Sequence, residues 1–230
     1  MPAAPHLASP FMNRLRARRA RWAWWWHTQG PRLGKRTLDL LVVLPALLLL
    51  LPLFGAVALA IRWCDGGPVL FWQRRVGRDG TVFAFPKFRS MRVDAEAVRE
   101  PLAASNQHGS DGVTFKMKRD PRITPVGRLI RRTSIDELPQ LWCVLRGTMS
   151  LVGPRPPLVG EVARYTLDDR QRLAVTPGLT CIWQVNGRSE VPFVQQVQMD
   201  LDYIRRPSLW ADVKLLLKTL PAVVRGRGAY

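Results

Sequence analysis

The sequence predicts an α+β protein that is mainly helical, with a proline-broken re-entrant membrane helix, a short β-hairpin and amphipathic interfacial helices around a small domain. Three observations predict this class. Residues 40–61 are uncharged and apolar, strand-like segments flank Asp79-Gly80, and apolar residues recur at helical spacing between positions 194 and 220. A length of 230 residues suits one domain plus a membrane element.

The charge of the chain restricts its partners. A formal net charge of +18 calls for anionic partners, which include nucleic acid, an acidic membrane surface and a phosphorylated substrate. The three cysteines form no C-x-x-C pair, which excludes a zinc ribbon and a disulfide framework. Two of the three histidines lie within the first 27 residues, which argues against a histidine-based triad. Any chemistry should therefore rest on carboxylates, hydroxyls and arginines.

Residues 1–33 form a basic segment rich in tryptophan and arginine. Indole rings sit at headgroup depth in membranes and arginine binds lipid phosphate, so this composition favours a membrane interface and anionic lipids as partners. A disordered basic tail is the alternative interpretation.

Residues 34–62 are predicted to be the membrane helix. The 22 apolar residues at positions 40–61 would form a helix of about 33 Å, close to the thickness of a bilayer core. Pro45 and Pro52 should kink or break it. Positive residues flank both ends, which favours a re-entrant helix that turns at Pro52 and leaves on the entry side. A kinked span and a signal peptide ending near residues 58–60 are the alternatives.

Residues 63–230 should form the domain itself. The hairpin around Asp79-Gly80 comes first, then a helix and loop over residues 94–119. Two helices follow, one with apolar residues from Val194 to Ile204 and one capped by Ser208. The last helix has a basic face, so it either packs on the core or lies on the membrane.

The candidate chemistry centres on Asp136 and Glu137. Ser134 and Glu137 match a helix-capping box, which is the purely structural interpretation. Pro139 opposes a helix that starts at Ser134 and favours a start nearer Asp136. Two adjacent carboxylates can divide their roles, because one can bind a divalent cation and the other can attack phosphorus.

A second motif strengthens this interpretation. The prolines of residues 153–157 restrict the backbone around Arg155, and a fixed guanidinium suits bidentate phosphate binding. A rigid surface turn is the alternative. Residues 177–180 and 184–188 are turn-rich and carry polar side chains that could contact a ligand.

Several of these motifs occur together in one order. They read K-R-x-x-D, K-F-R-S-M, D-P-R-I-T, S-I-D-E-L-P-Q-L, M-S-L-V-G-P-R-P, P-G-L-T and Q-V-N-G-R, between residues 35 and 188. The chain closely resembles the bacterial sugar transferase family, the monotopic phosphoglycosyl transferases, over residues 34–221. One motif alone would be weak, but the ordered set is specific.

The resemblance implies an enzyme with a small catalytic domain on the cytoplasmic face of the bacterial inner membrane. Such enzymes transfer a sugar-1-phosphate from a UDP-sugar to undecaprenyl phosphate and release UMP, which initiates a lipid-linked glycan or exopolysaccharide. By resemblance, Asp136 is the nucleophile that forms an aspartyl phospho-sugar intermediate, and Glu137 with Asp136 holds Mg²⁺.

The resemblance also implies a set of binding positions. Those expected to contact phosphate or substrate are Lys87, Arg89, Arg155, Gln184, Asn186 and Arg188. Asp200 and Asp212 match further acidic positions of open role, and Pro52 matches the residue that breaks the membrane helix.

The sequence departs from the family pattern at a few places. Leu51, Cys143, Thr148, Cys181 and Asp202 stand where other residue types are usual. These departures do not change the carboxylate pair, but with them the sequence does not identify the sugar that is transferred. The N-terminal extension is short, so the chain resembles the short form of the family.

Two other functions are compatible with parts of the sequence. The first is a catalytically inactive, membrane-bound interaction subunit of a glycan assembly complex. The second is a basic binder of nucleic acid or anionic lipid, which the apolar run and the lack of a nucleic-acid motif argue against. A homodimer remains open.

Overall fold

The computed structural model describes residues 10–95, 120–187 and 190–225, with side chains described between residues 32 and 222 of these ranges. The described part is mainly helical and has two small two-stranded sheets. Its elements are α1 (Pro10–Asp65), β1 (Leu70–Val76), η1 (Arg78–Gly80), β2 (Val82–Phe88), α2 (Pro125–Arg132), η3 (Ile135–Gln140), α3 (Leu141–Arg146), β3 (Ser150–Val152), α4 (Val159–Val162), α5 (Leu167–Arg170), η4 (Gln171–Ala174), β4 (Gly178–Thr180), α6 (Ile182–Asn186), α7 (Phe193–Arg205) and α8 (Leu209–Arg225).

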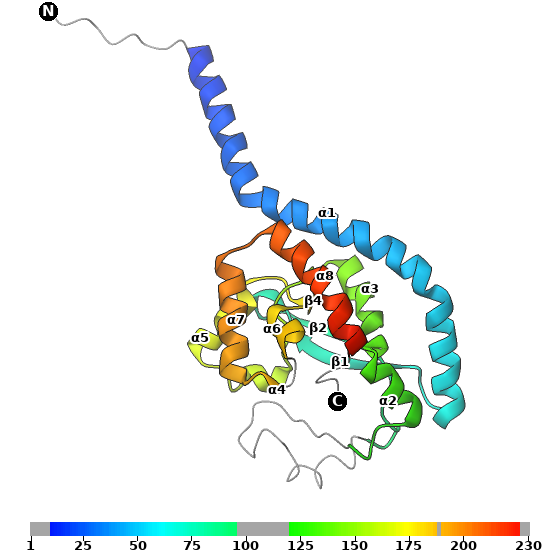
Figure 1. Cartoon of the computed structure of the whole chain (residues 1–230). Coiled ribbons are helices and arrows are strands. Elements are labelled where there is room, and N and C mark those ends of the chain that lie inside the picture. Colours follow the sequence, from blue (N-terminus) through cyan, green and yellow to red (C-terminus); the bar gives the residue numbers. More distant parts are fainter. Residues whose placement is uncertain (1–9, 96–119, 188–189, 226–230) are drawn as a thin grey trace, which may run out of the picture.

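Helix α1 is continuous through Pro45 and Pro52 and is curved, so of the predicted kink or break the structure shows a bend without a break (Figure 1). Both prolines lie on the exposed outer side of the helix. A proline ring clashes with the carbonyl of the preceding turn and opens the helix on its own side. The helix therefore bends away from the prolines and around the rest of the molecule.

The two sides of α1 differ sharply in burial. The inner side packs on the domain at helical spacing through Val43, Ala46, Leu47, Leu50, Leu53, Phe54, Val57 and Ile61. The outer side leaves large apolar side chains uncovered, namely Leu41, Leu44, Leu48, Leu49, Leu51 and Leu59. In the most apolar window of residues 32–65 only 11% of residues are buried, unlike the core helix of a soluble protein. This uncovered side is consistent with a membrane location.

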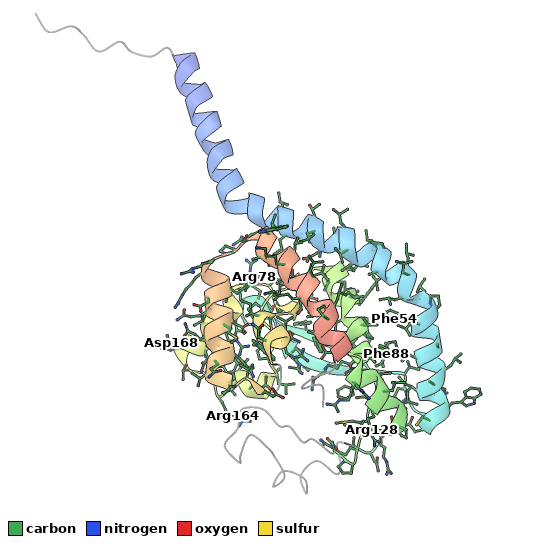
Figure 2. The ribbon with its side chains drawn as sticks, in the orientation of Figure 1. Phe54, Arg78, Phe88, Arg128, Arg164 and Asp168 are labelled. Carbon is green, nitrogen blue, oxygen red and sulfur yellow. The ribbon has the colours of Figure 1, made fainter. Side chains whose placement is uncertain are left out.

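The predicted hairpin is confirmed. Strands β1 and β2 pair antiparallel, with Leu70 opposite Phe88 and Val76 opposite Val82. Asp79 and Gly80 both have positive φ in the connecting turn, and these residue types adopt that conformation at low cost. Phe88 ends β2 and packs edge-on against Phe54 of α1, with ring centroids 5.6 Å apart (Figure 2).

A second pairing was not predicted. Strands β3 and β4 pair in parallel, although each has only three residues. Their ends approach closely because Gly153 and Gly178 face each other. A Cβ on Gly178 would lie 2.0 Å from the backbone nitrogen of Gly153. These two positions therefore require glycine.

The two predicted C-terminal helices are confirmed as α7 and α8. Ser208 precedes α8, and its Oγ accepts from the Ala211 nitrogen at 3.4 Å. The inner side of α8 places Leu215 in the main core, while Trp210 and Leu217 on the other side are exposed. The helix and loop predicted for residues 94–119 lie almost wholly outside the described residues.

Candidate active site

The carboxylate pair lies on η3, which packs against β2. Ser134, which precedes η3, has a φ of 55° and its side chain makes no capping bond. The capping-box interpretation is therefore wrong. The left-handed residue at the start and Pro139 inside the element are compatible with a short 3₁₀ turn.

Glu137 is held by two cations from separate elements. Arg155 Nη2 donates to Glu137 Oε1 at 2.5 Å, and Nη1 donates to Oε2 at 3.3 Å. Lys87 Nζ, from β2, donates to Oε1 at 2.9 Å. Burial alone would raise the pKa of Glu137, but Arg155 and then Lys87 outweigh it and hold that pKa well below its usual range. Glu137 is thus a permanently ionised carboxylate in a largely enclosed site.

Asp136 is adjacent and electrostatically different. Its side chain is 7% exposed and forms no ion pair with any residue that the structure describes. Burial, opposed by Lys87 and supported by the charge on Glu137, raises the pKa of Asp136 to about 6. A carboxylate with a raised pKa is more basic, and it is still mostly ionised at neutral pH.

Arg75 is a site residue that the sequence analysis missed. It donates from Nη1 to the carbonyl of Pro156 at 2.9 Å and lies 5.1 Å from the ring centroid of Phe85. Lys87 lies over the same ring at 5.6 Å. Burial and then the like charge on Arg155 lower the pKa of Arg75. Strand alternation is the signal that could have found it, because Arg75, Phe85 and Lys87 share one face of the hairpin.

The cluster has an excess of positive charge. Three cations, Arg75, Lys87 and Arg155, surround one permanently ionised carboxylate and a second one with a raised pKa. Like charges in a shielded site repel unless an anion balances them. A diphosphate would supply such an anion.

Other predicted positions lie in ion pairs of their own. Asp200 of α7 binds Arg172, whose Nε and Nη2 reach Asp200 Oδ2 at 2.8 and 2.6 Å. Asp212 of α8 binds Lys35 of α1 at 2.6 Å. Arg89 binds Asp65 at the end of α1. The structure therefore brings Lys87, Asp136, Glu137 and Arg155 together, but not Arg89, Asp200 or Asp212.

The remaining predicted residues have separate surroundings. Gln184 of α6 accepts from the buried Cys181 Sγ at 3.1 Å, and Asn186 at the end of α6 is exposed. Arg188 lies outside the described residues. The roles predicted for these three residues in substrate binding stay predictions.

The carboxylate pair suits one kind of metal site. The described residues contain no group of three or more His, Cys, Asp or Glu side chains that could hold a metal ion by themselves. Mg²⁺, however, usually takes one or two carboxylates, substrate phosphates and waters. Asp136 and Glu137 fit that requirement only together with a phosphorylated substrate.

The whole arrangement defines a class of protein. An acidic pair inside a basic cluster, on a domain wrapped by a long apolar helix, suits phosphate chemistry beside a membrane. The chain matches the bacterial sugar transferase family over residues 30–226 and belongs to that family.

Three relatives illustrate the similarity. The galactosyl transferase CpsE of Streptococcus agalactiae is 51% identical over 166 residues, which cover 72% of this chain and 36% of that protein. The undecaprenyl-phosphate galactose phosphotransferase of Salmonella typhimurium is 43% identical, over 88% of this chain and 43% of its own. The exopolysaccharide production protein ExoY of Rhizobium meliloti is 40% identical, over 86% of this chain and 88% of its own. The chain thus spans less than half of the first two proteins and most of the third.

Proposed function

We propose that this protein transfers a sugar-1-phosphate from a UDP-sugar to undecaprenyl phosphate and releases UMP. The observation that carries the proposal is the asymmetric carboxylate pair. Glu137 is fixed by Lys87 and Arg155, whereas its neighbour Asp136 is buried, without an ion-pair partner among the described residues, and more basic than usual. Membership of the family supports the same reaction class.

Asp136 acts as the nucleophile in this proposal. One of its carboxylate oxygens attacks the sugar-bearing phosphorus of the donor, and the bond from that phosphorus to the bridging oxygen breaks, so that UMP leaves. A phosphate oxygen of the lipid then attacks the same phosphorus. The bond to Asp136 breaks, and the products are a polyprenyl diphosphate sugar and free carboxylate.

The neighbouring residues stabilise charge on the transferring phosphate. Arg75, Lys87 and Arg155 provide preorganised positive groups, and the prolines beside Arg155 limit its backbone freedom. Mg²⁺, held by Asp136, Glu137 and the diphosphate, would neutralise further charge on the leaving group.

The membrane helix would bring the site close to the second substrate, the lipid phosphate. The uncovered apolar side of α1 would lie in the bilayer as a re-entrant helix, because positive residues flank both of its ends. The exposed apolar side of α8, with Trp210 and Leu217, would lie at the interface. In this proposal both helices would hold the domain at the cytoplasmic face of the inner membrane, with the lipid phosphate at the depth of the site.

The identity of the released nucleotide tests the proposal. Purified protein in detergent, with Mg²⁺, undecaprenyl phosphate and a panel of UDP-sugars, should release UMP with at least one donor. UDP-galactose is the first donor to test, because the names of two of the relatives above refer to galactose. Release of UDP would indicate a different class of glycosyltransferase, and no release with any donor would contradict the proposal.

A further inference from the structure

The K-R-x-x-D segment, residues 35–39, lies where α1 reaches the domain (Figure 1). Asp39 is buried, and its Oδ1 accepts from two donors on β3. These are Ser150 Oγ at 3.0 Å and the Leu151 backbone nitrogen at 2.9 Å. A single carboxylate oxygen of the apolar helix therefore holds the strand that leads to Arg155.

Arg36 contacts α3, the helix that follows the carboxylate pair of the site. Its Nη1 and Nη2 donate to the carbonyls of Val144 at 2.5 Å and Leu145 at 2.6 Å, in the last turn of α3. Helix α3 continues directly from η3, which carries Asp136 and Glu137. The Val144 carbonyl also accepts from the Gly147 nitrogen at 3.0 Å, so the guanidinium adds a second donor at the C-terminal end of α3.

Lys35 adds a third attachment. Its Nζ binds Asp212 at 2.6 Å and Tyr203 Oη at 3.0 Å, and Tyr203 Oη donates to Asp212 at 2.8 Å. Tyr203 Oη also lies 3.4 Å from the carbonyl of Val152, the last residue of β3. The segment thus contacts both the strand before Arg155 and the helix after Glu137.

We propose that Lys35, Arg36 and Asp39 form a clamp that positions Arg155 relative to Glu137, and that Asp39 is its principal positioning residue. The inference rests on the proposed function only for the reaction that is affected. The connection from Leu151 to Arg155 is short and stiff, because Gly153 packs directly on Gly178 and prolines flank the arginine. Seating of the membrane helix is thereby coupled to the geometry of the site.

Two variants of Asp39 test the clamp. Asp39→Asn keeps an oxygen that can accept from Ser150 and Leu151, so kcat for UMP release should stay within about threefold of wild type. Asp39→Ala removes that acceptor and should lower kcat on the order of 100-fold, because a small misplacement of a charge-stabilising group is costly. Equal losses in both variants would overturn the proposal.

Controls separate positioning from stability. Val57→Ala removes buried apolar contact elsewhere on α1, and Thr37→Ala changes an exposed residue inside the motif. Val57→Ala should lower the melting temperature about as much as Asp39→Ala does, while both controls keep kcat near wild type. A loss of kcat in Val57→Ala that follows its melting temperature would overturn the positioning role.

A double-mutant cycle tests whether Asp39 acts through Arg155. In an Arg155→Lys background, Asp39→Ala should cost less than about threefold in kcat, because the group that it positions is already altered. Fully additive losses would show that Asp39 acts elsewhere and would overturn the proposal.

A readout without catalysis covers the case in which the proposed function fails. If the wild-type protein releases no UMP, hydrogen exchange still tests the clamp. Asp39→Ala, but not Asp39→Asn, should accelerate exchange of the Leu151 amide and of residues 150–155. Unchanged exchange there would overturn the clamp whatever the reaction is.

Discussion

Two buried ion clusters in this protein use the same residue types to different ends. In one, Arg172 and Asp200 pair one to one, and the guanidinium also donates to Tyr165 Oη at 3.1 Å. It stacks near the rings of Tyr165 and Phe193, and both charged side chains are at most 5% exposed. The two charges of this pair balance each other, and both side chains are shielded from solvent.

The cluster around Glu137 is neither balanced nor closed. Its three cations exceed its two carboxylates, Asp136 and Glu137, and Lys87, Glu137 and Arg155 keep about a fifth of their side-chain surface exposed. Burial without a matched partner also raises the pKa of Asp136. The comparison teaches that unmatched charge next to an accessible surface indicates a ligand site, whereas a matched buried pair indicates structure.

The largest expected effect on activity comes from Asp136→Asn. It removes the nucleophile, so UMP release should fall by more than about 1,000-fold. Folding raises the pKa of Asp136, so ionisation of this residue opposes folding as pH rises from about 4 to about 6. The free energy of unfolding of the variant at pH 7.5 should therefore be at least as high as that of wild type, and higher by up to about 3 kcal/mol. Substantial activity would contradict the mechanism.

The next largest effect distinguishes Arg155, in the cluster around Glu137, from Arg172, in the balanced pair. Arg155→Ala should reduce kcat about 100-fold to 1,000-fold, and it should destabilise the fold less than Arg172→Ala does, because Glu137 keeps Lys87 as a partner. Arg172→Ala should instead destabilise the fold by about 3–5 kcal/mol, because Asp200 stays buried without its partner. Thermal unfolding and UMP release of both variants check this, with exposed Arg78→Ala as the control. The reverse pattern would remove the distinction between the clusters.

The pH dependence is the third effect. Only ionised Asp136 reacts, so kcat/KM for the donor should be level above about pH 7 and fall about tenfold per unit well below pH 6. Glu137 should not contribute, because Arg155 and Lys87 hold its pKa well below that range despite its burial. Initial rates between pH 4.5 and 8 test this, and a flat profile down to pH 4.5 would count against it.

The smallest effect concerns two neighbouring arginines. Arg75→Ala should lower kcat/KM about tenfold, because it removes one cation and the donor to the Pro156 carbonyl. Arg74→Ala, on the exposed face of the same strand, should have little effect. Equal losses from both would show that general positive charge matters rather than the position of Arg75.

Much of the fold could be predicted because its signals are local. The apolar run of residues 40–61, the Asp79-Gly80 turn and the periodicity of α7 and α8 each depend on residues near one another in the chain. The course of α1 was harder to predict, because the sequence left a kink and a break both open at the prolines, and the structure keeps the segment helical and curved through Pro52.

Strands β3 and β4 were missed for a related reason. Each has three residues, too few for an alternation pattern, and they pair only because other contacts bring residues 150–152 and 178–180 together. Arg75 was missed because the hairpin pattern alone gives it no role, and Pro156, whose carbonyl it contacts, comes from a distant position.

The sequence by itself determined the ingredients of this protein: an apolar helix with basic flanks, an adjacent Asp136 and Glu137, and an arginine held between prolines. Only the tertiary structure decided which charges meet. It placed Lys87 and Arg155 on Glu137, left Asp136 without an ion-pair partner among the described residues, and gave Asp200 a partner in Arg172. The physical reason is that the effect of a charge depends on burial and on the nearest opposite charge, and both are set by contacts between segments far apart in the chain.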